Sequence, residues 1–293
     1  MLIATLIAAD RLPAGDISRA SDMLASAGGE VAGSDWIEPD KAADIRFSGD
    51  IANARQAMAA FDGAVDAIVQ PEKGRAKALF VADMDSTMIT VECLDELADY
   101  AGFKDHVSAI TERAMRGELD FVEALDERVA LLADMDAEIV TRCHEERVEI
   151  SPGATTLVRT MRKHGTYCLL VSGGFTLFAD RVAAEIGFDR AVANRLEIEA
   201  GRLTGRVIRP IVDGGMKEKL LREEAEKRGL QPAETLAIGD GANDKAMVER
   251  AGLGVAYRGK PTLRDAADAR IDHGDLTALL YAQGYARKDW VDA

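Results

Sequence analysis

Two aspartates, Asp83 and Asp85, stand two residues apart directly after the short apolar run Ala78–Ala82. Such a run ending on an aspartate predicts a buried strand that delivers carboxylates to the edge of a sheet. Carboxylates this close together are costly to bury unless a cation or a reaction requires them. One could attack a phosphorus atom, forming an aspartyl phosphate, while the other protonates the leaving oxygen. An exposed Asp-x-Asp loop is the alternative, but the preceding strand and the hydroxyls of Ser86 and Thr87 favour phosphoryl transfer.

A carboxylate that attacks a dianionic phosphate ester needs its charge neutralised. Mg²⁺ does this with oxygen ligands from one or two carboxylates and the phosphate. Asp240 and Asp244 follow the apolar run Thr235–Ile238 and could complete such a site with Asp83. Their segment begins like a dinucleotide-binding fingerprint, but Asp244 replaces the third glycine, so a metal suits it better than a pyrophosphate.

Two further features could bind the phosphate. The hydroxyl of Ser172 and the open backbone of Gly173 and Gly174 could hold a phosphate oxygen at the start of a helix, although a plain helix-capping serine fits equally well. Lys217 begins a predicted helix that runs to about Arg228. It could neutralise the charges of the phosphate and of Asp83. Its position in the sequence alone, however, favours an ordinary solvated lysine on a charged helix face.

These polar segments must be brought together by the elements before them. The apolar runs Ala78–Ala82, Tyr167–Val171 and Thr235–Ile238 are separated by helical stretches. This alternation predicts an α/β fold with a doubly wound parallel sheet covered on both faces. Ligands of such folds bind beyond the carboxyl ends of the strands, so we expect the three segments to converge there.

Two stretches interrupt the alternation. Residues 92–152 have a helical apolar period and predict a helical insertion over the site, which we call the cap. Residues Asn194–Val207 predict a β-hairpin around Ala200-Gly201.

Residues 1–75 predict a separate α+β domain of order βαββαβ, followed by a second domain over residues 76–293. The predicted strands are Leu2–Ala8, Val31–Ile37, Ala43–Phe47 and Ala64–Val69, and the predicted helices are Ile17–Ala27 and Ala52–Phe61. The polar segment Gln70–Arg75 is predicted to be the linker.

Composition narrows the function. The chain has 293 residues and a net charge of -15, which disfavours nucleic acid as a partner. The chain has three cysteines without CxxC spacing, which argues against a set of disulfides or a zinc site. We therefore expect a reducing, cytoplasmic setting. The apolar start lacks a basic region and is too short to span a membrane, so we expect neither a signal peptide nor membrane attachment.

With these residues assembled, the chain resembles the haloacid dehalogenase (HAD) superfamily over about residues 76 to 285. Four motifs occur in that family's order: Asp-x-Asp-x-Thr at Asp83–Thr87, Ser-Gly-Gly at Ser172–Gly174, a lysine at Lys217, and Gly-Asp-Gly-x-Asn-Asp at Gly239–Asp244. The resemblance implies a HAD-like, Rossmannoid parallel sheet with a helical cap.

Rarer features narrow the resemblance to the phosphoserine phosphatases. In that family a glutamate contacts the substrate ammonium and a cap arginine binds its carboxylate, and the matching residues are Glu92 and Arg128. The cap residues Ala114–Gly117 and Phe121 and the hairpin Asn194–Val207 also match. A phosphorylated amino acid needs such an acid and arginine beside its phosphate site.

The resemblance implies a role for each residue. Asp83 would attack phosphorus, and Asp85 would protonate the serine oxygen and then activate water. Mg²⁺ would be held by the side chains of Asp83 and Asp240 and the Asp85 carbonyl, with Asp244 orienting its waters. The phosphate would be held by Lys217, Ser172 and Gly173, with Asn243 nearby. The expected reaction is hydrolysis of O-phospho-L-serine, the last step of serine biosynthesis.

Alternatives stay open at this point. A HAD phosphatase or phosphotransferase acting on another small phosphometabolite, such as phosphohomoserine, would share the motifs. A regulatory amino-acid-binding protein is a third hypothesis, because residues 1–75 resemble ACT-like domains. Such domains often bind amino acids or pair with copies of themselves, so a homodimer could form through this region.

Overall fold

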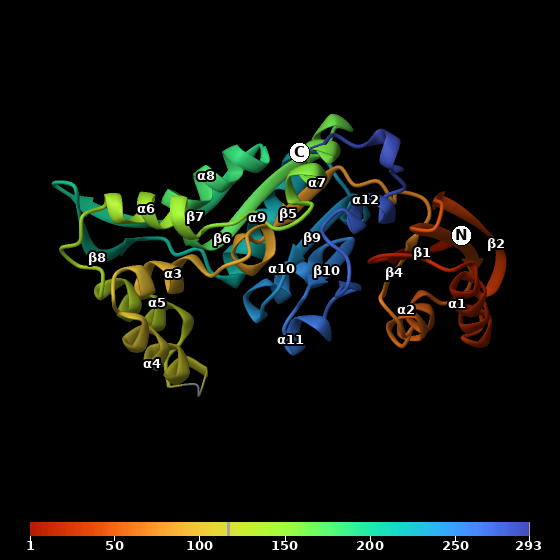
Figure 1. Ribbon diagram of the computed structural model, residues 1–293, viewed down its shortest axis with the longest axis horizontal. Helices are drawn as coiled ribbons and strands as arrows, with labels where there is room; N and C mark the ends of the chain where they lie inside the picture. The colour runs from red at the N-terminus through yellow and green to blue at the C-terminus, as the bar shows by residue number, and fades with distance from the viewer. Residues whose placement is uncertain (116–117, 293) are drawn as a thin grey trace.

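The protein consists of three parts arranged along its long axis (Figure 1). A computed structural model describes residues 1–115 and 118–292, and the side chains of Glu112 and Ala114–Gly117 lie outside this description. The N-terminal sheet lies at one end, most of the large sheet in the middle, and the cap together with the Asn194–Val207 hairpin at the other end.

The N-terminal part is a four-stranded antiparallel sheet in the order β2-β3-β1-β4, with two helices. Its elements are β1 (Leu2–Ala8), α1 (Ala14–Ser26), β2 (Glu30–Glu38), β3 (Ala42–Ser48), α2 (Ile51–Ala59) and β4 (Val65–Pro71). Leu24 of α1 and Met58 of α2 pack with Leu6 and Phe47 of the sheet in a core of their own. The predicted βαββαβ order is confirmed, and the arrangement is consistent with an ACT-like domain. The division of the chain at residue 75 stays a prediction.

The central sheet has seven strands in the order β11-β10-β9-β5-β6-β7-β8. Its strands are β5 (Leu79–Ala82), β6 (Tyr167–Phe175), β7 (Arg190–Glu199), β8 (Arg202–Ile208), β9 (Thr235–Gly239), β10 (Leu253–Tyr257) and β11 (Ala269–Ile271). All neighbouring pairs are parallel except β7 and β8, which form the predicted hairpin.

Helices cover both faces of this sheet, as predicted. They are α7 (Ala154–Lys163), α8 (Thr176–Ile186), α9 (Gly214–Lys227), α10 (Lys245–Arg250), α11 (Pro261–Arg264) and α12 (Ala278–Ala282). Alternate residues of β5 point to opposite faces. Leu79 and Val81 therefore join the core beneath α9 and α10, while Phe80 and Ala82 join the core beneath α7 and α8. This two-sided burial explains why β5 is apolar without a break.

The cap contains the helices α3 (Cys93–Tyr100), α4 (Lys104–Met115), α5 (Phe121–Ala130) and α6 (Glu138–Arg147). Asp120 begins α5 with a capping box, accepting a hydrogen bond from the Glu123 N–H at 2.8 Å. An isolated bridge between Ile89 and Ile150 closes the base of the insertion. Among the described residues, no helix is long and apolar enough to cross a membrane.

Two sequence predictions differ from the structure, and two strands were missed. The linker prediction was wrong at its first residues, because β4 continues to Pro71 and Gln70 pairs with Ile3 of β1. The Ser172–Gly174 segment lies within the last residues of β6 rather than at a helix start, and α8 begins only at Thr176. Strands β10 and β11 were not predicted.

Asp66 of β4 attaches the N-terminal part to the edge of the central sheet. Its buried carboxylate accepts backbone hydrogen bonds from Asp272 at 2.8 Å, His273 at 3.1 Å and Gly274 at 2.8 Å, in the turn after β11. Arg75 donates to the carbonyls of Tyr281 and Ala282, each at 3.0 Å, and also binds the buried Asp44 at 2.6 Å. The two parts thus share a polar, hydrogen-bonded contact.

We expect Asp66→Ala to destabilise the whole chain by about 2–3 kcal/mol, because three backbone N–H groups lose the buried carboxylate that accepts their hydrogen bonds. The measurement is the denaturation midpoint of the full-length protein. Asp62→Ala, at an exposed carboxylate of the same domain, is the matched control and should change stability by less than about 0.5 kcal/mol. Equal effects of the two variants would contradict this role of Asp66.

Candidate active site

Asp83 lies at the carboxyl end of the central strand β5. Its N–H still donates to the Ile238 carbonyl of β9 at 3.0 Å, which fixes the backbone at the sheet edge. The chain then passes through the tight turn Met84–Met88, which the Ile89 N–H closes by donating to the Met84 carbonyl at 3.0 Å and in which Ser86 takes a positive φ of 53°. This turn reverses the chain, so that Asp83 and Asp85 both line one cavity.

Lys217 is buried beneath Asp83. Its Nζ donates to Asp83 Oδ1 at 2.6 Å and to Asp244 Oδ1 at 2.7 Å. It lies in the first turn of α9, which Asp213 caps by accepting a hydrogen bond from the Met216 N–H at 2.8 Å. Burial lowers the pKa of Lys217, but the two carboxylates outweigh burial and raise it above its usual value. Lys217 is therefore a fixed positive charge under the nucleophile candidate, and not a solvated lysine.

Asp83 has one occupied oxygen and one open oxygen. Oδ1 accepts hydrogen bonds from Lys217 and from the Met84 N–H at 2.8 Å, whereas Oδ2 receives none from the described residues. Burial and the charge of Asp244 raise the pKa of Asp83, and Lys217 opposes them. A further cation beside Oδ2 would stabilise the ionised form that a nucleophile needs.

Asp83, Asp240 and Asp244 form a buried acidic cluster that could hold a metal. One oxygen from each lies within 4.8 Å of the others. The oxygens of Asp244 are already engaged, since Oδ1 binds Lys217 and Oδ2 accepts the N–H groups of Asp240 at 3.2 Å and Gly241 at 3.1 Å. Asp83 and Asp240 are therefore better placed than Asp244 to hold a metal, and Asp244 fixes Lys217 and the loop that carries Asp240.

Asp85 is held by groups from two other elements. Its Oδ1 accepts a hydrogen bond from the Cys93 N–H at 2.9 Å, and its Oδ2 accepts one from Ser172 Oγ at 3.1 Å. Burial raises the pKa of Asp85, although these hydrogen bonds oppose the shift. A carboxyl group with a raised pKa in a fixed position suits a group that donates and later accepts a proton.

The segment Ser172–Gly174 is a bulge at the end of β6, where the register with β7 shifts between Val171 and Phe175. Gly174 is needed there, because a Cβ at this position would lie 2.9 Å from Asp85 Oδ2. Asn194 of β7 supports the bulge by donating to the Gly173 carbonyl at 2.8 Å. The hydroxyl of Ser172 accepts the Gly174 N–H at 2.8 Å while it donates to Asp85, so it also positions that carboxylate.

The candidate site is a cavity of about 220 Å³ between the sheet edge and the cap. Its lining residues are Asp83, Asp85, Glu92, Leu94, Phe121, Leu125, Arg128, Gly173, Gly174, Phe175, Asp240, Asn243 and Lys260. Glu92 precedes α3 and accepts a hydrogen bond from Ser86 Oγ at 2.8 Å. Arg128 extends from α5, and its Nε donates to the Ala124 carbonyl at 3.1 Å.

An acid and an arginine of the cap thus share the cavity with the aspartates. Burial raises the pKa of Glu92, as does the charge of Asp85, while the hydrogen bond from Ser86 lowers it. Burial lowers the pKa of Arg128, and the nearby charges of Asp95 and Glu92 act in the opposite direction. The cavity therefore offers one negative and one positive group away from Asp83.

All the predicted site residues lie in or directly behind this cavity. Ser172, Lys217 and Asp244 are buried behind its wall, and the other predicted residues line it. Lys260 was not predicted. Its ammonium group lies 3.0 Å from Asp240 Oδ2, but it comes from a strand-to-helix connection with no motif around it. The one sequence signal for Lys260 is its position between an apolar run and Pro261, which is typical of a loop at the carboxyl end of a strand.

Residues 80–249 of the chain match the haloacid dehalogenase-like hydrolase family. A phosphoserine phosphatase of Archaeoglobus fulgidus is 47% identical over 217 residues, which cover 73% of this chain and 63% of that protein. The chain spans 52% of the length of two other phosphoserine phosphatases that it resembles, from Streptomyces coelicolor and Mycobacterium tuberculosis.

Two solved structures extend the similarity to the fold. A HAD-family hydrolase from Salmonella enterica serovar Typhi has a TM-score of 0.81 and 25% identity, covering 96% of this chain and 98% of that one. A phospho-aspartyl intermediate analogue of phosphoserine phosphatase has a TM-score of 0.65 and 36% identity, covering 70% of this chain and 98% of that one. The first similarity covers almost the whole chain and so includes the N-terminal sheet. The second covers 70% of the chain, about the length of the part that follows this sheet.

Proposed function

The chain belongs to the haloacid dehalogenase-like hydrolases, and within this family we propose that it hydrolyses O-phospho-L-serine to L-serine and phosphate. The main support is that Asp83, which is paired with the buried Lys217, lines the same cavity as Glu92 and Arg128 of the cap. The first pair suits a phosphate, and the second suits the ammonium and carboxylate of an amino acid. The similarity to phosphoserine phosphatases supports this substrate.

In the proposed reaction Asp83 attacks phosphorus and the serine oxygen leaves with a proton from Asp85. The aspartyl phosphate is then hydrolysed by a water molecule whose proton Asp85 accepts, which restores both carboxyl groups. Lys217 holds Asp83 in position from behind and offsets the negative charge that accumulates on the phosphoryl group. Ser172 keeps Asp85 oriented through both steps.

A divalent cation fits the site, because Asp83 and Asp240 bring buried carboxylate oxygens together. We propose that these two side chains and the Asp85 carbonyl hold Mg²⁺. When bound, the ion would neutralise the phosphate and polarise its oxygens. Asp244 and Lys217 keep the charge and position of the two carboxylates fixed beneath it.

Substrate recognition is proposed to lie with the cap. The guanidinium group of Arg128 can take a carboxylate with two parallel hydrogen bonds, and Glu92 can pair with an ammonium group. Leu94, Phe121 and Leu125 close the cavity with apolar side chains. A small phosphorylated amino acid satisfies each of these groups, whereas a sugar phosphate would leave Arg128 and Glu92 without partners.

A substrate panel tests this proposal. We expect hydrolysis of phosphoserine in the presence of Mg²⁺ to exceed that of sugar phosphates by at least about 100-fold in kcat/KM, and chelation of the metal to abolish it. Phosphothreonine and phosphohomoserine, which carry one more carbon than phosphoserine, should react more slowly. A preference for another phosphometabolite, or transfer of the phosphoryl group to added homoserine, would contradict the proposed function.

A further inference from the structure

Lys260 reaches the catalytic cavity from the edge of the sheet. Its backbone N–H donates to the Asp240 carbonyl at 2.7 Å, and its Nζ lies 3.0 Å from Asp240 Oδ2. The preceding turn is fixed, because the Arg258 N–H donates to the Ile271 carbonyl at 2.9 Å and α11 begins at Pro261. The fold therefore places this lysine beside a proposed metal ligand.

The two lysines near the aspartates differ in their freedom. The side chain of Lys217 is 1% exposed and is held between two carboxylates. The side chain of Lys260 is 64% exposed, and its partner Asp240 is 9% exposed. A lysine has a flexible stem and three donors, so Lys260 can change partners without rearranging the core.

More carboxyl groups than cations line the cavity. Four carboxylates line it, namely Asp83, Asp85, Glu92 and Asp240, and the lining cations among the described residues are Arg128 and Lys260. Burial lowers the pKa of Lys260, but the hydrogen bond and charge of Asp240 raise it more, and the charge of Glu92 adds to this. Lys260 thus brings a cation next to Asp240, and the charge of Glu92 also acts on it.

We propose that Lys260 is an exchangeable cation that pairs with Asp240 until a divalent metal takes this carboxylate, and then binds the phosphate group of the substrate. The proposal rests on the proposed function. A lysine on Asp240 opposes metal binding, because it occupies an oxygen and repels the ion. The same positive charge attracts a phosphate dianion into the cavity. Lys260 should therefore weaken metal binding and strengthen phosphate binding.

Lys260→Met tests these opposite effects in the full-length protein. Binding of Mn²⁺ without phosphate, followed by its electron paramagnetic resonance signal, should become about tenfold tighter. Binding of inorganic phosphate at saturating Mg²⁺, measured by calorimetry, should become about tenfold weaker. Lys260→Arg, which retains the charge, should keep both affinities within about threefold of the unchanged protein.

Lys219→Met is the matched control, because Lys219 is a half-exposed lysine of α9 that pairs with Glu223 on the surface. It should change neither affinity. If Lys260→Met weakens both ligands together, the lysine has only a structural role and the proposal is wrong. Unchanged affinities would also overturn it. If the protein without any substitution binds neither Mn²⁺ nor phosphate, the proposed function is wrong, and so is this proposal.

Discussion

Replacing Asp83 by asparagine is expected to abolish phosphoserine hydrolysis, with kcat falling by at least about 10⁴-fold. The amide has nearly the same shape as the carboxylate and can still accept a hydrogen bond from Lys217. It cannot, however, attack phosphorus, and it carries no charge to bind a metal. The loss should therefore appear in turnover and not in folding, and the measurement is phosphate release under saturating phosphoserine and Mg²⁺.

Asp10→Asn provides the control for this variant, because Asp10 is an exposed aspartate in the turn after β1. Its turnover should equal that of the unchanged protein. Thermal unfolding of both variants separates a chemical loss from a folding defect. Turnover by Asp83→Asn within about 100-fold of the unchanged protein would show that another group attacks phosphorus.

Replacing Arg128 by alanine is expected to lower kcat/KM for phosphoserine by about 100- to 1000-fold, since a partly buried, bidentate contact to the substrate carboxylate is lost. Hydrolysis of an aryl phosphate, which has no carboxylate, should fall by less than about threefold. The ratio of the two specificity constants is the measurement. Arg128→Lys should recover only part of the loss, because an ammonium group lacks the planar fork.

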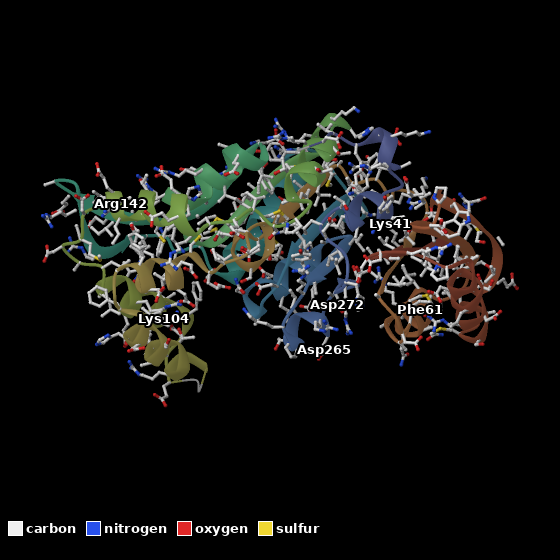
Figure 2. All side chains as sticks on the ribbon, in the orientation of Figure 1. Lys41, Phe61, Lys104, Arg142, Asp265 and Asp272 are labelled. Carbon is white, nitrogen blue, oxygen red and sulfur yellow. The ribbon has the colours of Figure 1, made fainter. Side chains whose placement is uncertain are left out.

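The matched control for Arg128 is Arg142→Ala. Arg142 is an exposed arginine of the cap helix α6 and is labelled in Figure 2. Its removal should leave both specificity constants unchanged. Equal losses on phosphoserine and the aryl phosphate in Arg128→Ala would mean that this arginine supports the cap and does not recognise a carboxylate.

The elements that carry the site could be predicted because their signals are local. β5 is buried on both faces, so its sequence is apolar without a break until Asp83. Parallel strands end at the same edge of a sheet, so the polar segments at the carboxyl ends of β5, β6 and β9 had to meet. The helical period of the cap was likewise visible in its sequence.

The remaining features depend on contacts that no short segment reveals. Lys260 and its partner Asp240 are brought together by the pairing of β9 with β10, and neither strand predicts that pairing by itself. The last residues of β6 are Gly-rich, so their strand geometry depends on β7 and on Asn194. Gln70 looked like part of a polar linker, yet its side chain is buried and donates to the Ala282 carbonyl at 2.8 Å.

The boundary between the N-terminal and central parts shows the same limit. In Figure 2, Phe61 lies on the N-terminal side and Asp272 on the other, and both line a cavity of about 320 Å³. The arginines of this cavity pair with aspartates of the chain, as in the contact of Arg264 with Asp272 at 2.5 Å. These ion pairs link residues from separate elements. The sequence therefore shows which residues are charged but not which of them pair.

The central claim is that Asp83 carries the phosphoryl group of phosphoserine during the reaction. The most direct test mixes the protein and Mg²⁺ with phosphoserine labelled with radioactive phosphorus, quenches in acid within milliseconds and locates the label by peptide mass spectrometry. We expect a label on Asp83 in the unchanged protein and none in Asp83→Asn. Serine release without any labelled intermediate, or a label on another residue, would contradict it.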